Sequence, residues 1–343
     1  YNFYNINQGI GVLFVKNSKN FLPRKIALGT SSALLATLIA VNGTGLAQAS
    51  ETQHHSNNPQ TTHQNSQNTL KKTQNKTAFN ENNYMDKNFD LRKRCFALMG
   101  AAEDSNLNYS KNYRSVSGDE HDGRGITAGV IGFTSGTGDM KEMLDYYNKI
   151  SPNKPLADDK DNMNNLKEEK LKKDWYNAFD NDHDNFVKAQ NYEVKKEVMD
   201  KAVKYAKEDG LSQLGQYIYF DTLVKHGPGK NPQDPPRDWS FGAIREHAKE
   251  NGVKPPSEGG NESSYLQNFV GKRYVAINDE NKHSSGMDTE GTTDRFKFQL
   301  DQIKKGNFDL KLPLDFNMNQ TDFHLDQKKL NKFSDKDLAS LND

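Results

Sequence analysis

Two carboxylates in the first third of the sequence have the type and spacing that acid–base hydrolysis needs. Glu103 closes a segment of helical periodicity, one position past the apolar residue Ala102. Asp122 follows in an acidic, glycine-containing loop, residues 118–127. A carboxyl group at a helix end and another on a facing loop can serve as general acid and general base. The alternative is a solvated acidic loop that carries no chemistry.

The elements that must hold this pair follow from periodicity. Apolar residues spaced by four, three and four positions predict an amphipathic helix over residues 88–105, capped by Asn88 or Asp90. The β-branched run over residues 126–133 predicts a strand or extended segment. Further helices are expected at residues 137–149, 163–179, 184–207, 211–225, 239–250 and 263–278. The fold class expected is mainly α, with only a little sheet.

Composition excludes some functions. The 46 basic and 46 acidic side chains balance, which excludes a nucleic-acid binder that works by bulk positive charge. The mean hydropathy of −0.96 is too polar for a protein with many membrane spans. The only cysteine, Cys95, cannot form an intramolecular disulfide, so we interpret it as a small buried hydrophobic residue.

The first 49 residues have the features of a secretory signal. They contain four basic and no acidic residues, an apolar run over residues 26–41, and the small-x-small site Ala47-Gln48-Ala49. The run is interrupted and shorter than the roughly 20 residues of a membrane span. Residues 21–25 (FLPRK), with Gly29 and Ser32, resemble the YSIRK-type signal of Gram-positive bacteria, although the first three positions differ. We therefore expect cleavage before Ser50 and a secreted, extracellular protein.

Two regions follow the predicted signal. Residues 50–84 are rich in Asn, Gln, Thr, Ser and His and poor in aliphatic residues, so we expect a disordered linker. Its histidines lack cysteine or carboxylate neighbours, which favours a solvated tract over a metal site. Residues 85–343 are long enough for one large catalytic domain or for two lobes around a cleft.

Several sequence motifs together resemble the chitosanases of glycoside hydrolase family 46. The matching runs are AAEDS at residues 101–105, DGRGITAGVIGFTSGTGDM at 122–140, DGL at 209–211, LGQ at 214–216, DTLVKHGPG at 221–229, SFGAIR at 240–245, GGNE at 259–262 and GNFDL at 306–310. The resemblance spans most of residues 90–312. It implies a two-lobed, lysozyme-like fold with a small β-sheet and a substrate cleft between the lobes. It also implies endo-hydrolysis of β-1,4 links in chitosan with inversion, and no cofactor.

The resemblance also assigns roles to residues. It implies that Glu103 is the general acid, that Asp122 is the general base, and that Thr127 helps to hold the attacking water. Asp139 and Glu280 match carboxylates that contact substrate, although Glu280 is also compatible with an exposed helix end.

Three further residues near these motifs are candidates for the substrate cleft. Asp119 belongs to a cluster of acidic residues in the sequence, with Asp104, Glu120 and Asp139. This cluster would attract a polymer that is cationic below roughly pH 6.5. Arg124, in the Gly-Arg-Gly turn, and His226 are interpreted as cleft-lining or structural.

Two charges are predicted to point into the core. Asp221 and Arg273 each follow the apolar stripe of a predicted helix, so each needs a partner. The resemblance supplies the partners, because it groups Asp221 with Arg273 and Arg295 behind the active site. There the three residues would position or tune the acid. A plain buried salt bridge is the alternative.

Two rival functions stay open. A cell-wall muramidase uses the same pair of carboxylates, but it acts on a neutral or anionic polymer and gains little from an acidic cleft. A non-catalytic protein that binds amino sugars would use the carboxylates only for contact. We expect chitosan and glucosamine oligosaccharides as partners and a monomer. We expect no metal, no nucleic acid and no membrane span in the mature form.

Overall fold

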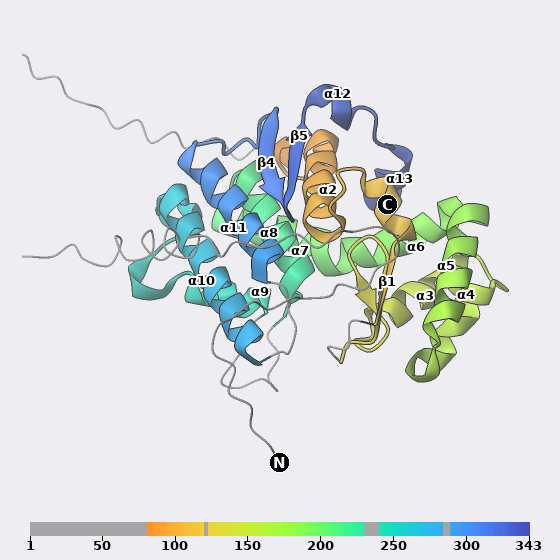
Figure 1. Cartoon of the computed structure of the whole chain (residues 1–343). Helices are drawn as coiled ribbons and strands as arrows, with labels where there is room; N and C mark the ends of the chain where they lie inside the picture. Colours follow the sequence, from red (N-terminus) through yellow and green to blue (C-terminus); the bar gives the residue numbers. More distant parts are fainter. Residues whose placement is uncertain (1–80, 120–122, 230–239, 284–288) are drawn as a thin grey trace, which may run out of the picture. The chain divides into compact units, whose positions relative to one another are not determined.

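Helix α2 (Phe89–Asp104) carries Glu103 and lies in the interior of the structure (Figure 1). The computed structural model describes residues 81–119, 123–229, 240–283 and 289–343. Asn88 caps α2 by accepting a hydrogen bond from the Leu91 amide at 2.9 Å, as predicted. The predicted amphipathic character is wrong, because Arg92 and Lys93 are buried as well as the apolar stripe. The helix is therefore enclosed on its polar side too.

A three-stranded antiparallel sheet follows α2 in the chain. Its strands are β1 (Val116–Asp119), β2 (Ile126–Ala128) and β3 (Phe133–Thr134), in the order β1-β2-β3. The predicted single strand over residues 126–133 is thus two strands joined by a turn. Gly129 and Gly132 take positive φ values of 85° and 73° in this turn, and the Gly132 amide donates to the Gly129 carbonyl. Glycine is the residue that adopts such values without strain.

The six further predicted helices are present, with shifted ends. The helices that follow the sheet are α3 (Asp139–Ile150), α4 (Pro155–Asp158), α5 (Glu168–Asn181), α6 (His183–Val194), α7 (Asp200–Asp209), α8 (Gln213–His226), α9 (Phe241–His247) and α10 (Glu262–His283). The predicted helix over 184–207 corresponds to α6 and α7, which a π-helical turn, Lys195–Met199, joins into one run. Helix α5 begins later than predicted, because residues 159–165 form a 3₁₀ segment with non-helical dihedrals at Asn162.

Of the elements after α10, the sequence indicated only an alternation of apolar residues at Leu314, Phe316 and Met318 and a Lys-rich, helix-like end. These elements are α11 (Thr289–Lys304), the antiparallel hairpin of β4 (Leu314–Met318) and β5 (Thr321–Leu325), α12 (Gln327–Leu330) and α13 (Lys336–Ala339). In α11 the apolar residues Phe296, Phe298 and Leu300 alternate, which is a strand-like period. The segment is nevertheless helical: Phe296, Leu300 and Ile303 are spaced by four and three positions, and Gln299 and Gln302 are buried on the same helix.

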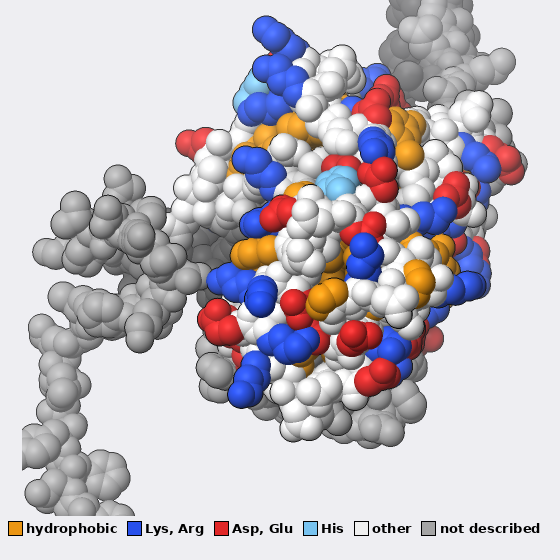
Figure 2. Space-filling view, turned by 90° about the vertical axis from the view of Figure 1, so that its right-hand side faces the viewer, with side chains coloured by type: hydrophobic (Ala, Val, Ile, Leu, Met, Phe, Trp, Pro, Cys, Tyr) orange, Lys and Arg blue, Asp and Glu red, His pale blue; other side chains and the backbone are white. Residues whose placement is uncertain are grey.

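The described structure confirms the predicted fold class of mainly α with a small sheet. Cys95 is fully buried, and burial raises the pKa of its thiol to about 12. Acidic and basic side chains lie interspersed over the face that is on the right-hand side of Figure 1, as Figure 2 shows. Within the described ranges, none of the helices has the length and apolarity that crossing a membrane requires.

The predicted signal peptide and residues 50–80 of the predicted linker lie outside the described residues. Residues 81–84 are part of the structure: a 3₁₀ turn, Glu81–Asn83, leads into Tyr84, which is buried in the core.

Candidate active site

Glu103 lies in the last turn of α2, where the chain leaves the helix. Ser105 ends the helix in a left-handed conformation, with φ of 51°. The Glu103 side chain is 29% exposed, and its Oε1 accepts a hydrogen bond from Arg295 Nη2 at 2.5 Å. This carboxyl group is therefore accessible from solvent and held from the protein side by one arginine.

Behind Glu103 lies a buried network of charges from three helices. Asp221 of α8 accepts hydrogen bonds from Arg273 of α10 at 2.6 Å and from Arg295 of α11 at 3.0 Å. Asp221 and Arg273 are fully buried, and Arg295 is 5% exposed. The structure thus brings together the three residues that the family resemblance grouped, and Arg295 connects them directly to Glu103.

The electrostatics of this network keep Asp221 and Arg295 in their charged forms. Burial alone would raise the pKa of Asp221, but Arg273, Arg295 and a hydrogen bond from Gln299 together lower it below its ordinary value. Arg295 has a raised pKa despite its burial, because Glu103 and Asp221 both stabilise its charge. The buried Asp221 carboxylate is therefore paired with two guanidinium groups, which is the compensation that buried charges need.

Gln299 is a member of this network that sequence reasoning missed. Its Nε2 donates to Asp221 Oδ2 at 2.9 Å, and its Oε1 accepts from Arg273 Nη1 at 3.4 Å. Gln299 lies four positions after Arg295, so both side chains point from the same face of α11. Recognition of α11 as a helix would have identified it.

The sheet and its loops form a second group of predicted site residues. Thr127 is half-buried in the middle strand, β2, opposite Gly118 on β1 and Thr134 on β3. Asp119 and Arg124 are exposed on either side of residues 120–122. Asp122, the predicted general base, lies outside the described residues.

The chain that follows Asp122 is tied to the loop after β3. The Gly136 amide donates to the Arg124 carbonyl at 2.8 Å, and the Ile126 amide donates to Ser135 Oγ at 2.9 Å. A Cβ atom on Gly136 would lie 2.7 Å from the Arg124 carbonyl oxygen, so the two backbones approach at a distance that only glycine permits. These contacts fix the chain two residues after the predicted base.

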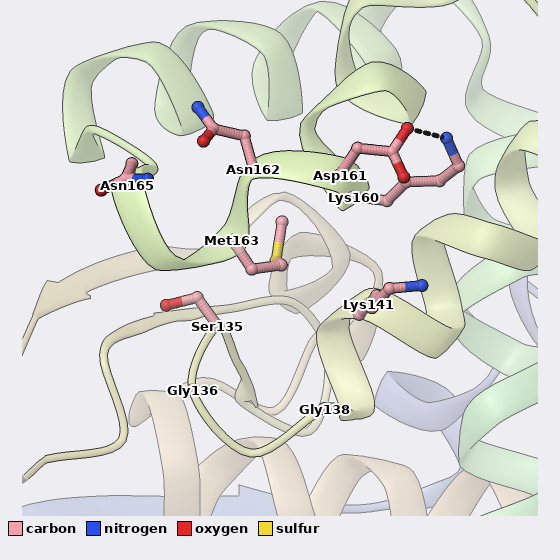
Figure 3. A pocket seen from close by; sticks show the side chains of 9 residues that line it. All are labelled: Ser135, Gly136, Gly138, Lys141, Lys160, Asp161, Asn162, Met163 and Asn165. Atoms are coloured by element: carbon pink, nitrogen blue, oxygen red, sulfur yellow. Dashed lines mark hydrogen bonds and ion pairs between the residues drawn. The ribbon is translucent and has the colours of Figure 1, made fainter.

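Asp139, a predicted substrate-binding carboxylate, begins α3 and organises the same loop. Its Oδ1 accepts hydrogen bonds from Thr137 Oγ1 at 2.7 Å and from the amides of Met140 and Thr134 at 2.9 and 3.1 Å. Each of these bonds goes to Oδ1. A pocket of about 430 Å³ opens beside this loop, with Ser135 on one side and Asn162, Met163 and Asn165 on the other (Figure 3).

The other predicted contact residues lie in helices. Glu280 is in the last turn of α10, and its side chain lies outside the described part. His226 is half-buried at the C-terminal end of α8, five residues after Asp221. Among the side chains that the structure describes, no three His, Cys, Asp or Glu residues are grouped to hold a metal ion.

The comparison with known families decides the class of protein. The sequence profile of glycosyl hydrolase family 46 matches residues 97–314, more than half of the chain. The chain belongs to this family. It is 37% identical over 227 residues to a chitosanase of Streptomyces sp. (strain N174), with 63% of this chain and 75% of that protein covered. A chitosanase of Nocardioides sp. (strain N106) is 35% identical over 227 residues, with the same coverage.

The fold of this family 46 hydrolase is also that of solved relatives. The co-crystal structure of chitosanase OU01 with substrate superposes with a TM-score of 0.60 at 34% identity, covering 68% of this chain and 96% of that chain. The lysozyme-like fold expected from the sequence is therefore confirmed. The family match ends at residue 314, so most of the β4–β5 hairpin and the helices that follow lie beyond it.

Asp104, the neighbour of Glu103 in the family 46 hydrolase, has an unusual titration. Burial and the nearby charge of Glu103 raise the pKa of Asp104 to about 6, although Ser115 Oγ donates to its Oδ1 at 3.1 Å. The folded protein therefore binds this proton more tightly than the unfolded chain does. The stability that this group contributes is present at low pH and is lost as the pH rises from about 4 to about 6.

Replacement of Asp104 by Asn should remove this loss. We expect Asp104→Asn to be more stable than the wild type at pH 8, by about 1–2 kcal/mol, and to be about as stable as the wild type at pH 4. Urea denaturation at the two pH values measures the difference. Ser115→Ala is the matched control. It should be less stable than the wild type at pH 8, because it removes the hydrogen bond that stabilises the ionised Asp104 carboxylate. A gain for Asp104→Asn that is equal at both pH values would contradict the assignment.

Proposed function

We propose that this family 46 hydrolase is a secreted endo-chitosanase that cleaves β-1,4-glucosaminyl links by a single displacement with inversion. Glu103 acts as the general acid and Asp122 as the general base. The observation that carries the proposal is the Glu103 carboxyl group, exposed at a helix end and held by Arg295 at 2.5 Å. The relatives named chitosanase support the substrate class.

The geometry at Glu103 suits a proton donor. Arg295 binds Oε1, so Oε2 is the atom that would carry the proton to the leaving oxygen. Arg295 is itself held in place by its hydrogen bond to the buried Asp221, so the position of its guanidinium group does not depend on Glu103. Asp221, Arg273 and Arg295 therefore act as positioning residues for the acid.

The second carboxylate must activate water on the opposite face of the sugar. Inverting glycosidases hold their two carboxyl groups about 6.5–9.5 Å apart so that a water molecule fits between the base and the sugar. Asp122 comes four residues before β2, and Thr127 on that strand would hold the same water by its hydroxyl group. Because glucosamine lacks an N-acetyl carbonyl, the substrate cannot supply the nucleophile, and both enzyme carboxyl groups are needed.

The charge of the substrate supports the same assignment. Chitosan is a polycation below roughly pH 6.5, so carboxylates attract it to the site. Asp119 is exposed at the end of β1, and Asp139 organises the loop that lies over the C-terminal side of the Asp122 segment. Both would contact the amino groups of the polymer, with Arg124, His226 and Glu280 as further contacts along the chain.

The stereochemistry of the first product tests the proposal. Protein recovered from the culture medium is mixed with fully deacetylated glucosamine hexamer, and NMR follows the anomeric protons from the first minute. We expect the α-anomer to appear first, because inversion converts a β link into an α product. Release of the β-anomer would overturn the single displacement. Absence of cleavage would overturn the substrate assignment, and absence of the protein from the medium would overturn secretion.

A further inference from the structure

We propose that Asn319, in the turn of the β4–β5 hairpin, is a positioning residue for the acid Glu103. The inference rests on the proposed function, since it concerns the placement of the proposed proton donor. Asn319 lies beyond residue 314, where the family match ends. Figure 1 shows the hairpin beside α2, the helix that carries Glu103.

The contact is made to the last turn of α2. Asn319 Nδ2 donates to the Ala102 carbonyl at 2.9 Å, to the Ala101 carbonyl at 3.3 Å and to Ser105 Oγ at 3.2 Å. The Ser105 amide, which would ordinarily bond to the Ala101 carbonyl, donates to the Gly100 carbonyl instead. The asparagine therefore satisfies carbonyl groups that the helix end leaves open.

The turn presents this side chain in a fixed direction. Strands β4 and β5 pair from Leu314 opposite Leu325 to Met318 opposite Thr321, which leaves a two-residue turn. Its two residues, Asn319 and Gln320, have φ values of 50° and 60°. These values belong to the type I′ turn, in which asparagine is strongly favoured at the first position. The turn therefore fixes the direction of the Asn319 side chain, and the end of α2 supplies the oxygen atoms that it binds.

The hairpin itself is anchored independently of Asn319. Leu314, Met318 and Leu325 are buried, and the Phe316 ring packs on Phe298 of α11 at 4.8 Å. Helix α11 also carries Arg295. The same hairpin thus packs on the helix whose arginine holds the Glu103 carboxyl group, and it binds the backbone one residue before Glu103.

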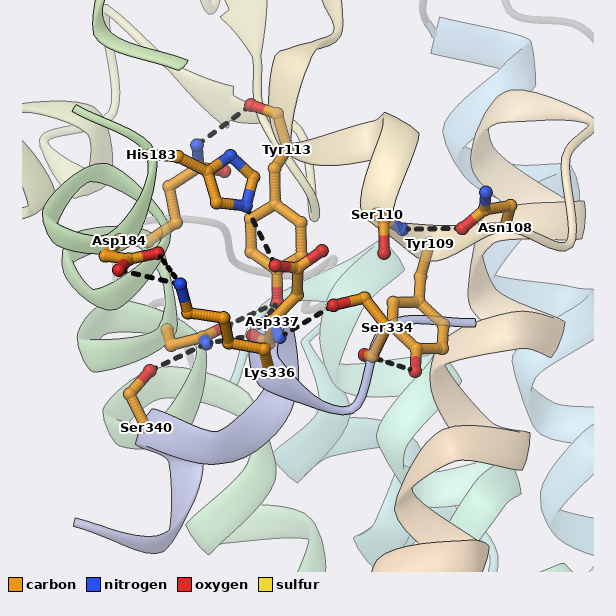
Figure 4. A network of polar contacts seen from close by, with 12 residues as sticks. Asn108, Tyr109, Ser110, Tyr113, His183, Asp184, Ser334, Lys336, Asp337 and Ser340 are labelled. Carbon is orange, nitrogen blue, oxygen red and sulfur yellow. Dashed lines mark hydrogen bonds and ion pairs between the residues drawn. The ribbon is translucent and has the colours of Figure 1, made fainter. Parts of the chain in front are cut away.

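The chain after the hairpin is bound to the protein by other contacts. Arg92 Nη1 donates to Asn342 Oδ1 at 2.8 Å, and the Lys93 ammonium group pairs with Asp335. Tyr109 donates to the Ser334 carbonyl at 2.9 Å and Tyr113 to the Asp337 carbonyl at 3.2 Å (Figure 4). Loss of the Asn319 amide should therefore leave the C-terminal segment in place and change only the end of α2.

Asn319 affects the rate through the distance between the Glu103 carboxyl group and the leaving oxygen. A general acid must lie within hydrogen-bond reach of the leaving oxygen, and displacement by a fraction of an ångström lowers the rate. Asn319 binds the backbone immediately before Glu103, at Ala101 and Ala102, while Arg295 binds the Glu103 carboxyl group. Without the amide, the last turn of α2 can fray, and the proton donor loses its position although the base and the substrate contacts are unchanged.

Two substrates separate this role from a general effect on the fold. Glucosamine hexamer needs protonation of its leaving oxygen. A 2,4-dinitrophenyl β-glycoside of the glucosamine trimer does not, because dinitrophenolate leaves without a proton. The variant Asn319→Gly keeps the positive φ of the turn and removes the amide. Asn319→Asp keeps the shape and removes the donor. Asn317→Ala is the matched control, since Asn317 bonds only across the hairpin to Asp322 among the contacts described.

We expect Asn319→Gly and Asn319→Asp to lower kcat on the hexamer about 10-fold, with KM and the rate on the dinitrophenyl glycoside changed less than about twofold. Asn317→Ala should match the wild type on both substrates. Equal losses on both substrates, or no loss on the hexamer, would overturn the inference. A wild-type protein that cleaves neither substrate would instead overturn the proposed function, and Glu103→Gln, assayed in parallel, shows whether the hexamer reports on the acid.

Discussion

Glu103→Gln is expected to lower kcat on glucosamine hexamer about 10³-fold while the protein still binds the hexamer. Glutamine has nearly the shape of glutamate, and its amide can still contact Arg295, but it has no carboxyl proton to donate to the leaving oxygen. General acid catalysis contributes about 10²–10⁴ to glycosidic cleavage, so the loss should be close to complete. Initial rates of reducing-end formation and calorimetric titration with the hexamer measure the two quantities.

The same variant separates the competing functions. A protein that only binds amino sugars would keep its full function in Glu103→Gln, and a muramidase would cleave cell-wall polymer but not the hexamer. Asp122→Asn is the companion variant, and it should lose turnover on the hexamer to a similar extent because it removes the proposed base. Full hydrolysis by Glu103→Gln would refute the assignment of the acid.

Asp221→Ala is expected to lower the free energy of unfolding by about 3–5 kcal/mol. Asp221 accepts hydrogen bonds from Arg273, Arg295 and Gln299 with no exposure to solvent, so its removal leaves two buried guanidinium groups facing a cavity. The loss exceeds that of an ordinary core truncation because the remaining charges have no water to replace the carboxylate. Urea denaturation followed by circular dichroism measures the change.

A surface pair provides the control for this prediction. Asp180 accepts a hydrogen bond from Arg114 at 3.0 Å, and both side chains are at least 40% exposed. Asp180→Ala should change the free energy of unfolding by less than about 1 kcal/mol. A double replacement, Asp221→Leu with Arg273→Met, should recover part of the loss, because it removes one of the unpaired charges. A loss below about 1 kcal/mol for Asp221→Ala itself would show that the network does not act as a buried ion cluster.

Periodicity predicted the longer helices from α2 to α10, including α8, which is buried on all sides from Leu214 to Leu223, and it missed α11. Helix α3 was predicted because its apolar side chains form one buried stripe. Helix α11 was missed because Phe296, Phe298 and Leu300 alternate like the residues of a strand, and because the polar residues Gln299 and Gln302 are buried with them. In such a helix the core contains glutamine and arginine side chains whose partners come from α8 and α10. Their burial depends on contacts that no local window of sequence contains.

The candidate site likewise contains residues that the sequence indicated and residues that it did not. The sequence indicated that Asp221 and Arg273 point inward, because each charge lies on an apolar stripe. It contained no local signal for the bond of Arg295 to Glu103, which joins residues 192 positions apart. Asn319 was equally hidden, since residues 314–318 alternate like any exposed hairpin. Only the packing of the hairpin against α2 shows that its turn reaches a helix end.

The enclosure of α2 has a consequence for the order in which the chain folds. Lys93 bonds to the Phe333 carbonyl across 240 positions, and Arg92 bonds to Asn342 across 250 positions. Contacts of such high sequence separation close large loops, and topologies that depend on them fold slowly. During synthesis, α2 emerges long before the segment that receives its two cations. Of the α-helices that the structure describes, the one that carries Glu103 is therefore made first, and its surroundings are complete only when the C-terminal segment is present.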